Sequence, residues 1–268
     1  MIKTIIFFLL LVAHLPVSAA LRVVAAENVY GELAKIIGGE FVEVRSILNN
    51  TTQDPHLFSA TPGIAKAVAK ADLVIYNGLG YDDWMRKLVS VSSKSVIVVA
   101  DLTSYKTGEN PHLWYDPTVM PKLAQKLTDE FIAQDPKNQK IYEKNLQVFT
   151  TDYQRLTQRI QDLKKDLQGV SVLVTESLFD YMGAALGLKM QVLNSASPGP
   201  RELKHMEDAI KQRHVKFLIY NTQVNQPLVN RLRELAYQKG IPTVGVTETQ
   251  PVGVSYIQWM GQQLELLE

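Results

Sequence analysis

The chain has 268 residues, of which 46% are hydrophobic and 21% are charged, a composition typical of a globular protein with room for two ordinary domains. Its 28 basic residues nearly balance its 27 acidic residues, so the charge gives no reason to expect a nucleic-acid or anionic-membrane partner. The absence of cysteine excludes disulfides and thiolate metal sites.

Residues 1–20 have the pattern of a secretory signal peptide. Lys3 supplies the positive charge, residues 5–12 form an unbroken apolar run, and the small residues before Ala20 offer a cleavage site. The run is too short to cross a membrane, and no later stretch is long and apolar enough. Without Lys3 the basic residues number 27, equal to the 27 acidic residues. Since no cysteine is present for lipid attachment, we expect a free periplasmic protein.

Residues 21–134 alternate short apolar runs with amphipathic segments. This alternation predicts an α/β lobe whose mostly parallel sheet is covered by helices on both faces. Asn28 is expected to cap the first helix. Strands are predicted at residues 21–26, 42–48, 73–76 and 95–99, and helices at residues 28–37, 62–69, 81–89 and 116–133.

Residues 135–168 carry one long apolar stripe with alternating steps of four and three residues, which predicts a single helix roughly 45–50 Å long. Asp135 is the expected N-cap, Pro136 the first helical residue, and Gly169 the stop. A coiled-coil arm and a rigid strut between two lobes both fit the stripe. We favour the strut because both flanks have α/β patterns. The stripe consists of Tyr142, Leu146, Phe149, Tyr153, Leu156, Ile160, Leu163 and Leu167.

Residues 169–268 repeat the α/β pattern, so the predicted fold class is α/β, with two lobes of mostly parallel sheet joined by one long helix. Ligands bind beyond the carboxyl ends of such strands, which places a small-ligand cleft between the lobes. Strands are predicted at residues 170–174, 189–193, 215–220 and 242–246, and helices at residues 176–186, 201–212, 227–239 and 255–267.

Two histidines occur in near-copies of one motif, DPHLF at residues 54–58 and NPHLW at residues 110–114. Both motifs lie in loops after predicted strands. The proline stiffens each loop, and the bulky residue two positions after the histidine can anchor it. We interpret His56 and His112 as paired metal ligands rather than two unrelated surface histidines.

Residues beside these histidines suggest how they are held. Asp54 and Asn110 could bond the loop backbone or a ring N–H and so fix the imidazole tautomer. The other histidines of the mature chain, His205 and His214, lie among charged residues and are interpreted as solvated surface side chains.

Two imidazoles leave a metal short of ligands, and without cysteine the remaining ligands must be carboxylates. Glu176 and Glu248 each directly follow a predicted strand of the second lobe. The alternatives are a helix-dipole acid for Glu176 and a surface loop charge for Glu248. Other acidic residues, among them Asp180, are interpreted as caps and turn formers. No dinucleotide, Walker or nucleophile-elbow motif occurs.

These motifs resemble the solute-binding proteins of bacterial zinc and manganese ABC importers, over nearly all of the mature chain. That family has two α/β lobes bridged by a long rigid helix and holds its metal in the cleft. The resemblance rests on the segment around His56, on residues 77–84 and 110–117, on Thr175, Glu176, Phe179 and Tyr181, and on residues 253–260.

The resemblance implies a ligand set by position. His56 and His112 occupy the positions of the two metal-binding histidines of the first lobe. Glu176 occupies the position of the third ligand, which is a glutamate in manganese-type members. Glu248 falls near the fourth, where members usually carry aspartate. The His-rich loop of many zinc members is absent here, since residues 103–109 are short and contain no histidine.

We therefore expect a monomeric periplasmic protein that captures one zinc or manganese ion (Zn²⁺ or Mn²⁺) and delivers it to an ABC permease in the inner membrane, without catalysis. Metal release is expected through local loop shifts in the second lobe. Three alternatives stay open at this point: a metal-dependent hydrolase using the same His/Glu site, a binder of a metal chelate or cobalamin, and a surface adhesion module.

Overall fold

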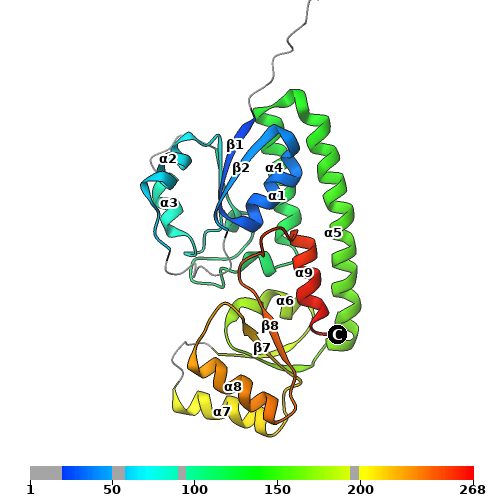
Figure 1. The fold of residues 1–268 in the computed structure, drawn as a ribbon. Coiled ribbons are helices and arrows are strands. Elements are labelled where there is room, and N and C mark those ends of the chain that lie inside the picture. Colours follow the sequence, from blue (N-terminus) through cyan, green and yellow to red (C-terminus); the bar gives the residue numbers. More distant parts are fainter. Residues whose placement is uncertain (1–19, 50–57, 90–94, 194–198) are drawn as a thin grey trace, which may run out of the picture.

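The computed structural model describes residues 20–49, 58–89, 95–193 and 199–268, which form two α/β lobes alongside one long helix (Figure 1). The predicted fold class is confirmed, because each lobe contains one four-stranded parallel sheet. His56 and residues 1–19 of the predicted signal peptide lie outside the described residues. The division at residues 134 and 168 remains a prediction.

The sheet of the first lobe has the strand order β2-β1-β3-β4. Its central strands β1 and β3 are largely buried because helices cover both faces, whereas β2 at the edge of the sheet alternates apolar with polar residues. One face packs against α1 and α4, the other against α2 and α3. The elements are β1 (Leu21–Glu27), α1 (Asn28–Gly38), β2 (Val42–Leu48), α2 (Pro62–Lys70), β3 (Leu73–Tyr76), α3 (Asp83–Val89), β4 (Ser95–Val98) and α4 (Val119–Gln134).

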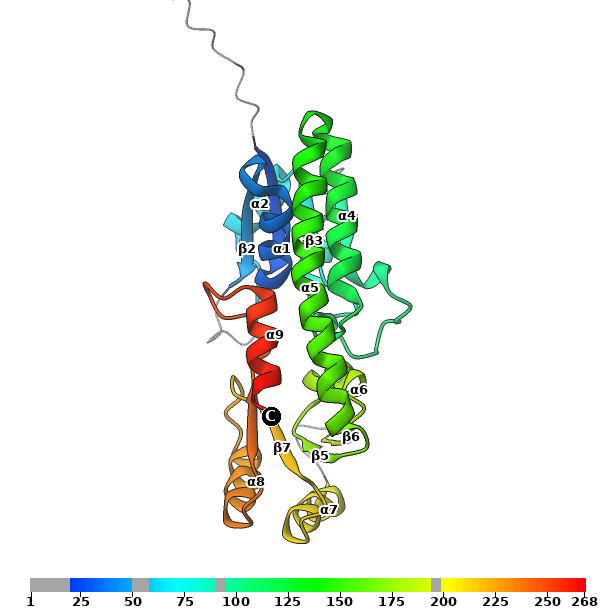
Figure 2. The ribbon, with the colours of Figure 1, turned by 90° about the vertical axis from the view of Figure 1, so that its right-hand side faces the viewer.

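The sheet of the second lobe has the equivalent order β6-β5-β7-β8. Helices α7 and α8 cover its outer face, while α6 and α9 lie on the face toward α5 (Figure 2). The elements are β5 (Ser171–Val174), α6 (Asp180–Ala185), β6 (Lys189–Val192), α7 (Pro200–Lys211), β7 (Phe217–Asn221), α8 (Pro227–Gln238), β8 (Thr243–Val246) and α9 (Tyr256–Glu265).

The linking helix α5 (Gln139–Leu167) has 29 residues and is about 44 Å long. It packs against α1 and α4 in the first lobe and against α9 beside the second, as the predicted strut requires (Figure 2). Of the predicted stripe, Leu146 and Leu163 are partly buried. The buried members are Tyr142, Phe149, Tyr153, Leu156, Ile160 and Leu167.

Neither of the two predicted N-cap side chains, Asn28 and Asp135, makes a capping hydrogen bond, because each bonds another partner. Asp135 precedes a 3-10 turn, and α5 starts later, at Gln139. Its carboxylate instead accepts hydrogen bonds from the Tyr142 hydroxyl at 2.8 Å and from the Asn138 amide. Asn28 makes no cap and donates to the Gln250 carbonyl at 2.6 Å, which ties α1 to the last loop of the chain.

One hydrophobic core runs through both lobes. The Tyr115 ring of the first lobe lies 5.6 Å from the Phe179 ring and 5.8 Å from the Trp259 ring, centre to centre. The Tyr256 hydroxyl of α9 donates to the Trp114 carbonyl at 2.8 Å. The C-terminal segment therefore returns to the junction and packs the two lobes together. Within the described chain, every helix is too short or too polar for a membrane span.

The stripe of α5 is expected to contribute strongly to stability. Ile160 is 2% exposed, so Ile160→Ala should lower the free energy of unfolding by about 2–5 kcal/mol through lost burial and a cavity. Val148 on the same helix is 53% exposed, and Val148→Ala should change it by less than about 0.5 kcal/mol. Urea unfolding of both variants checks this; equal destabilisation would contradict the packing role of the stripe.

Two carboxyl groups are buried together at the end of β1. Glu27 is 4% exposed and Asp82 is 1% exposed. Asp82 accepts hydrogen bonds from the backbone N–H groups of Asn77 and Gly78. Burial first, and then the Asp82 charge, raise the pKa of Glu27 well above its ordinary value of 4.5. Burial also raises the pKa of Asp82, while its hydrogen bonds from Gly78 and Asn77 lower it, so the protonated form is favoured most clearly at Glu27.

This pair predicts a pH-dependent stability. The folded state binds the Glu27 proton more tightly than the unfolded state. The contribution of Glu27 to the free energy of unfolding is therefore fully present below pH 4.5 and is lost as the pH rises through the higher pKa of the folded state. Each pKa unit of that shift corresponds to about 1.4 kcal/mol. Glu27→Gln keeps a donor toward Asp82 and cannot ionise, so its unfolding free energy should vary less with pH. Urea unfolding across pH checks this, with exposed Glu40→Gln as the control; parallel profiles would contradict it.

Candidate metal centre

The carboxyl ends of the strands in the two sheets meet at the junction of the lobes. Glu248 follows β8, and Glu176 is two residues beyond β5. His112 directly precedes the 3-10 turn Leu113–Tyr115, which enters α4. The topology thus brings loops of both lobes to one place, where open α/β sheets bind ligands.

His112 is 7% exposed and sits in an aromatic setting. Its ring lies edge-on to Tyr81 at 6.1 Å and to Trp114 at 5.5 Å, centre to centre. Trp114 is 1% exposed, so it anchors this loop as predicted. Phe58, the corresponding residue of the first motif, packs on the Trp84 ring at 4.7 Å.

Asn110 fixes the tautomer of His112, as predicted. The Asn110 Nδ2 donates to the Ser177 carbonyl at 2.6 Å, while its Oδ1 accepts the backbone N–H of His112 at 3.0 Å. The amide orientation is therefore set by two independent partners. Oδ1 also lies 2.7 Å from His112 Nδ1 and can only accept there, so Nδ1 carries the proton. The lone pair of Nε2 is left for a metal.

Glu248 is a buried carboxylate of the junction rather than a surface charge, with 3% of its area exposed. Its Oε1 accepts from the Tyr81 hydroxyl at 2.9 Å, and its Oε2 accepts from Asn221 Nδ2 at 3.2 Å. The Gln223 side chain holds the Glu248 backbone N–H at 2.6 Å. Burial first, and then the Glu248 charge, raise the pKa of Tyr81 far above its ordinary value, so its hydroxyl stays a donor.

His112 and Glu248 meet across the lobes at a separation suited to a shared ion. His112 Nε2 lies 3.6 Å from Glu248 Oε1, too far for a hydrogen bond. Two ligand atoms bound at about 2.1 Å with a tetrahedral angle lie about 3.4 Å apart. The gap therefore matches two ligands on either side of one cation.

Glu176 lies in a loop of the same junction, but it is not grouped with His112 and Glu248 closely enough for the three to hold one ion. It is partly buried and has an extended backbone. Burial first, and then the charges of Glu248 and Glu176, raise the pKa of Tyr115, so both carboxylates act electrostatically on the same hydroxyl. Among the described residues, no three histidine or acidic side chains are grouped closely enough to hold an ion. The predicted fourth member, His56, lies outside those residues.

The sequence reasoning missed several contributors to this region. Asp180 was interpreted as a cap, yet burial raises its pKa to about 6, while nearby His112 and a hydrogen bond with Asn110 lower it. The charge of His112 therefore acts on Asp180, although burial has the larger effect. Asn221 ends β7, where the strand-end rule could have identified it, but no signal distinguished Gln223. His205 and His214 are exposed, as predicted.

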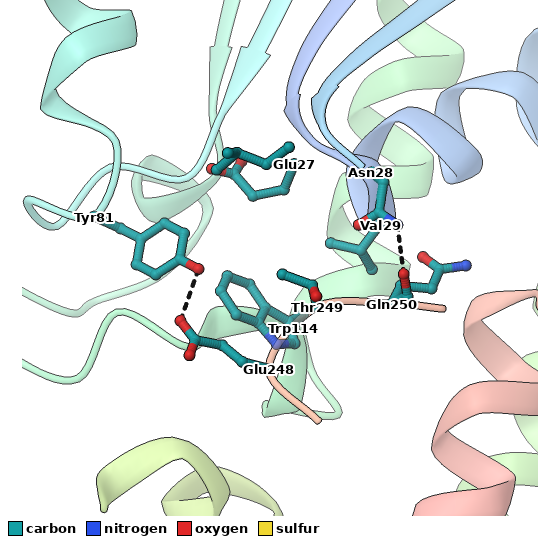
Figure 3. A pocket seen from close by; sticks show the side chains of 9 residues that line it. Glu27, Asn28, Val29, Tyr81, Trp114, Glu248, Thr249 and Gln250 are labelled. Carbon is teal, nitrogen blue, oxygen red and sulfur yellow. Dashed lines mark hydrogen bonds between the residues drawn. The ribbon is translucent and has the colours of Figure 1, made fainter. Parts of the chain in front are cut away.

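A narrow cavity lies between the lobes behind Tyr81 and Glu248. Figure 3 shows the Tyr81 hydroxyl directed at Glu248, with Glu27 and Trp114 beside them. The cavity has a volume of about 10 Å³, enough for a single water molecule or ion. As the described residues shape it, the cavity is far too small for a cobalamin or a metal chelate. Its lining is Glu27, Asn28, Val29, Leu48, Tyr81, Trp114, Glu248, Thr249 and Gln250.

Comparisons with known proteins agree with this arrangement. The sequence model of the family described as zinc-uptake complex component A, periplasmic (ZnuA), matches residues 23–268. The manganese-binding lipoprotein MntA of Halalkalibacterium halodurans is 25% identical over 246 residues, which cover 87% of this chain and 81% of that protein. The manganese ABC transporter substrate-binding lipoprotein PsaA of Streptococcus pneumoniae is 26% identical over an alignment of 276 positions, gaps included. The alignment covers 92% of this chain and 88% of that protein.

A solved structure shows the same fold. The periplasmic zinc-binding protein TroA of Treponema pallidum matches with a TM-score of 0.79 at 19% identity, covering 93% of this chain and 98% of that one. The family match includes both lobes, the linking helix and the loops of His112, Glu176 and Glu248. The chain therefore belongs to the ZnuA family, the substrate-binding proteins of zinc and manganese ABC importers.

Proposed function

We propose that this protein captures one divalent transition-metal ion, zinc or manganese, between its lobes and hands it to the permease of an ABC importer. Family membership supports the transport role. The zinc in the family description and the manganese in the name of PsaA support the choice of cargo. Periplasmic location and a monomeric state are part of the proposal.

The ligands that we propose are His56, His112, Glu176 and Glu248. The observation that carries the proposal is the 3.6 Å gap between the unprotonated Nε2 of His112 and the Glu248 carboxylate, with one group from each lobe. Two neutral imidazoles and two carboxylates would cancel the charge of a divalent cation. This compensation matters because an unpaired charge is costly at so buried a place.

The donor set is compatible with both metals. Two carboxylate oxygens favour manganese more than a site with three histidines would, whereas the intrinsic affinity order favours zinc. Four protein ligands would close the coordination sphere and leave no open position for a substrate, which suits capture rather than catalysis. The hydrolase alternative has no support from the comparisons, and we propose that the protein is not an enzyme.

Metal content tests the ligands directly. His112→Ala and Glu248→Gln should each weaken binding by more than the roughly 10–100-fold that loss of an outer-shell partner costs. His205→Ala and His214→Ala are the controls: each removes one imidazole, as His112→Ala does, but from an exposed position, and each should leave metal binding unchanged. Elemental analysis and titration of the purified mature protein with Zn²⁺ and Mn²⁺ make the comparison. Full metal content in both His112→Ala and Glu248→Gln would place the site elsewhere.

Acid should weaken metal binding. Imidazoles bind metal only when neutral, so protons compete with the ion for the histidines, and affinity should fall as the pH is lowered from about 8 to about 5. Competition titrations with a chelator of known pH dependence check this for each metal. An affinity that stays constant over this range would argue against histidine ligation.

A further inference from the structure

Asn110 connects the two lobes beside the candidate metal centre. It belongs to the first-lobe loop that carries His112, but two of its hydrogen bonds reach the second lobe. Its Nδ2 donates to the Ser177 carbonyl at 2.6 Å, and its backbone carbonyl accepts from the Tyr181 hydroxyl at 2.7 Å. Ser177 is the residue that follows the proposed ligand Glu176.

The same amide controls the His112 ring. Its Oδ1 accepts both the backbone N–H and the Nδ1–H of His112, at 3.0 and 2.7 Å. The acceptor end of the amide therefore faces the histidine, and the donor end faces the second lobe. A rotation of the amide would place donors against the two N–H groups of His112 and an acceptor against the Ser177 carbonyl, so the two contacts support each other.

We propose that Asn110 is a positioning residue that couples His112 to the second-lobe segment of residues 176–181. The proposal rests on the proposed function of the site. A displacement of this segment moves Glu176 and at the same time withdraws the carbonyl that holds the Asn110 amide. His112 then loses its fixed ring orientation, so a ligand from each lobe is released in one event.

Neighbouring contacts make this connection firm. The Tyr181 ring packs on the Tyr105 ring at 4.8 Å, and the Tyr105 hydroxyl donates to Asp116 of the first lobe at 2.9 Å. The segment that carries Glu176 is thus held against the His112 loop by contacts that need no metal. Since these contacts are made by protein groups alone, they position both ligands for binding.

Two substitutions separate ring positioning from coupling. Asn110→Ala removes both ends of the amide. Asn110→Asp keeps an acceptor for the His112 ring but turns a carboxylate oxygen toward the Ser177 carbonyl and the nearby Asp180, which repels the second lobe. Asn145→Ala is the matched control, because Asn145 likewise donates to a backbone carbonyl, that of Ile37 at 2.9 Å, far from the site.

The first measurement uses the metal-free protein. Nitrogen-15 NMR should show His112 with its proton on Nδ1 in the wild type, in Asn110→Asp and in Asn145→Ala, and a mixture of tautomers in Asn110→Ala. Amide hydrogen exchange in residues 176–181 should be faster in both Asn110 variants and unchanged in Asn145→Ala.

The second measurement is the rate of metal release to a chelator at about pH 8, where the new carboxyl of Asn110→Asp is ionised. Electrostatics alone would slow release, because the variant adds a negative charge beside a cation. Coupling predicts the opposite, release faster by at least about tenfold. Folding of each variant is checked by its urea midpoint.

Release from Asn110→Asp at the wild-type rate or slower would overturn the coupling, as would unchanged hydrogen exchange in both Asn110 variants. A pure Nδ1–H tautomer in Asn110→Ala would overturn the positioning role. If the wild type binds no metal, the proposed function fails, and the tautomer and exchange measurements on the metal-free protein decide the coupling separately.

Discussion

The hydrophobic core that crosses the junction of the lobes is the constraint on which the rest of the structure depends. The apolar stripe of α5 packs on the first lobe near its start and beside α9 near its end. Helix α9 brings Trp259 against the Tyr115 ring and Tyr256 against the Tyr153 ring of α5. Because this core is shared, the lobes cannot separate freely, and polar groups at the junction must find partners within the protein. His112 and Glu248 are held by such partners. The ligands of such a site are already positioned by the protein. Metal release from it is more compatible with local loop movements than with a wide hinge motion of the lobes.

The junction is also electrostatically unusual, because it gathers acidic groups at low exposure. Glu248 and Glu27 are nearly inaccessible to solvent, and the carboxyl of Asp180 has a raised pKa. Buried carboxylates raise the free energy of the folded state unless a proton, a donor or a cation compensates them. Glu27 is compensated by a proton, and Glu248 by the donors Tyr81 and Asn221. A divalent ion between Glu248 and His112 would complete this compensation, which connects the packing of the fold to the transport of a cation.

Local patterns predicted the elements well and their first residues less well. The strands at residues 42–48 and 73–76 have the predicted bounds, since the first alternates apolar with polar residues and the second is a short apolar run. The caps proposed for Asn28 and Asp135 make no side-chain capping hydrogen bond: Asn28 donates to the distant Gln250, whereas Asp135 accepts from Tyr142, seven residues along the chain. Asp180, interpreted as a cap or turn former, does lie at the turn that opens α6, and no local pattern indicated that the charge of His112 acts on it. Short polar side chains bond whichever partner the fold brings near, and for Asn28 that partner lies 222 residues away, outside any local sequence window.

The sequence by itself determined the class of the fold, the long helix between two α/β lobes, and the candidate ligands His112 and Glu248, because periodicity, strand-end position and residue chemistry are local properties. The tertiary structure alone decided that these two side chains face each other at 3.6 Å, that the amide of Asn110 is held by the Ser177 carbonyl of the second lobe, and that Glu248 is buried rather than solvated. These facts depend on how two sheets and α9 pack around one core. Distances across such a junction follow from the sum of many packing contacts, and no single stretch of sequence records that sum.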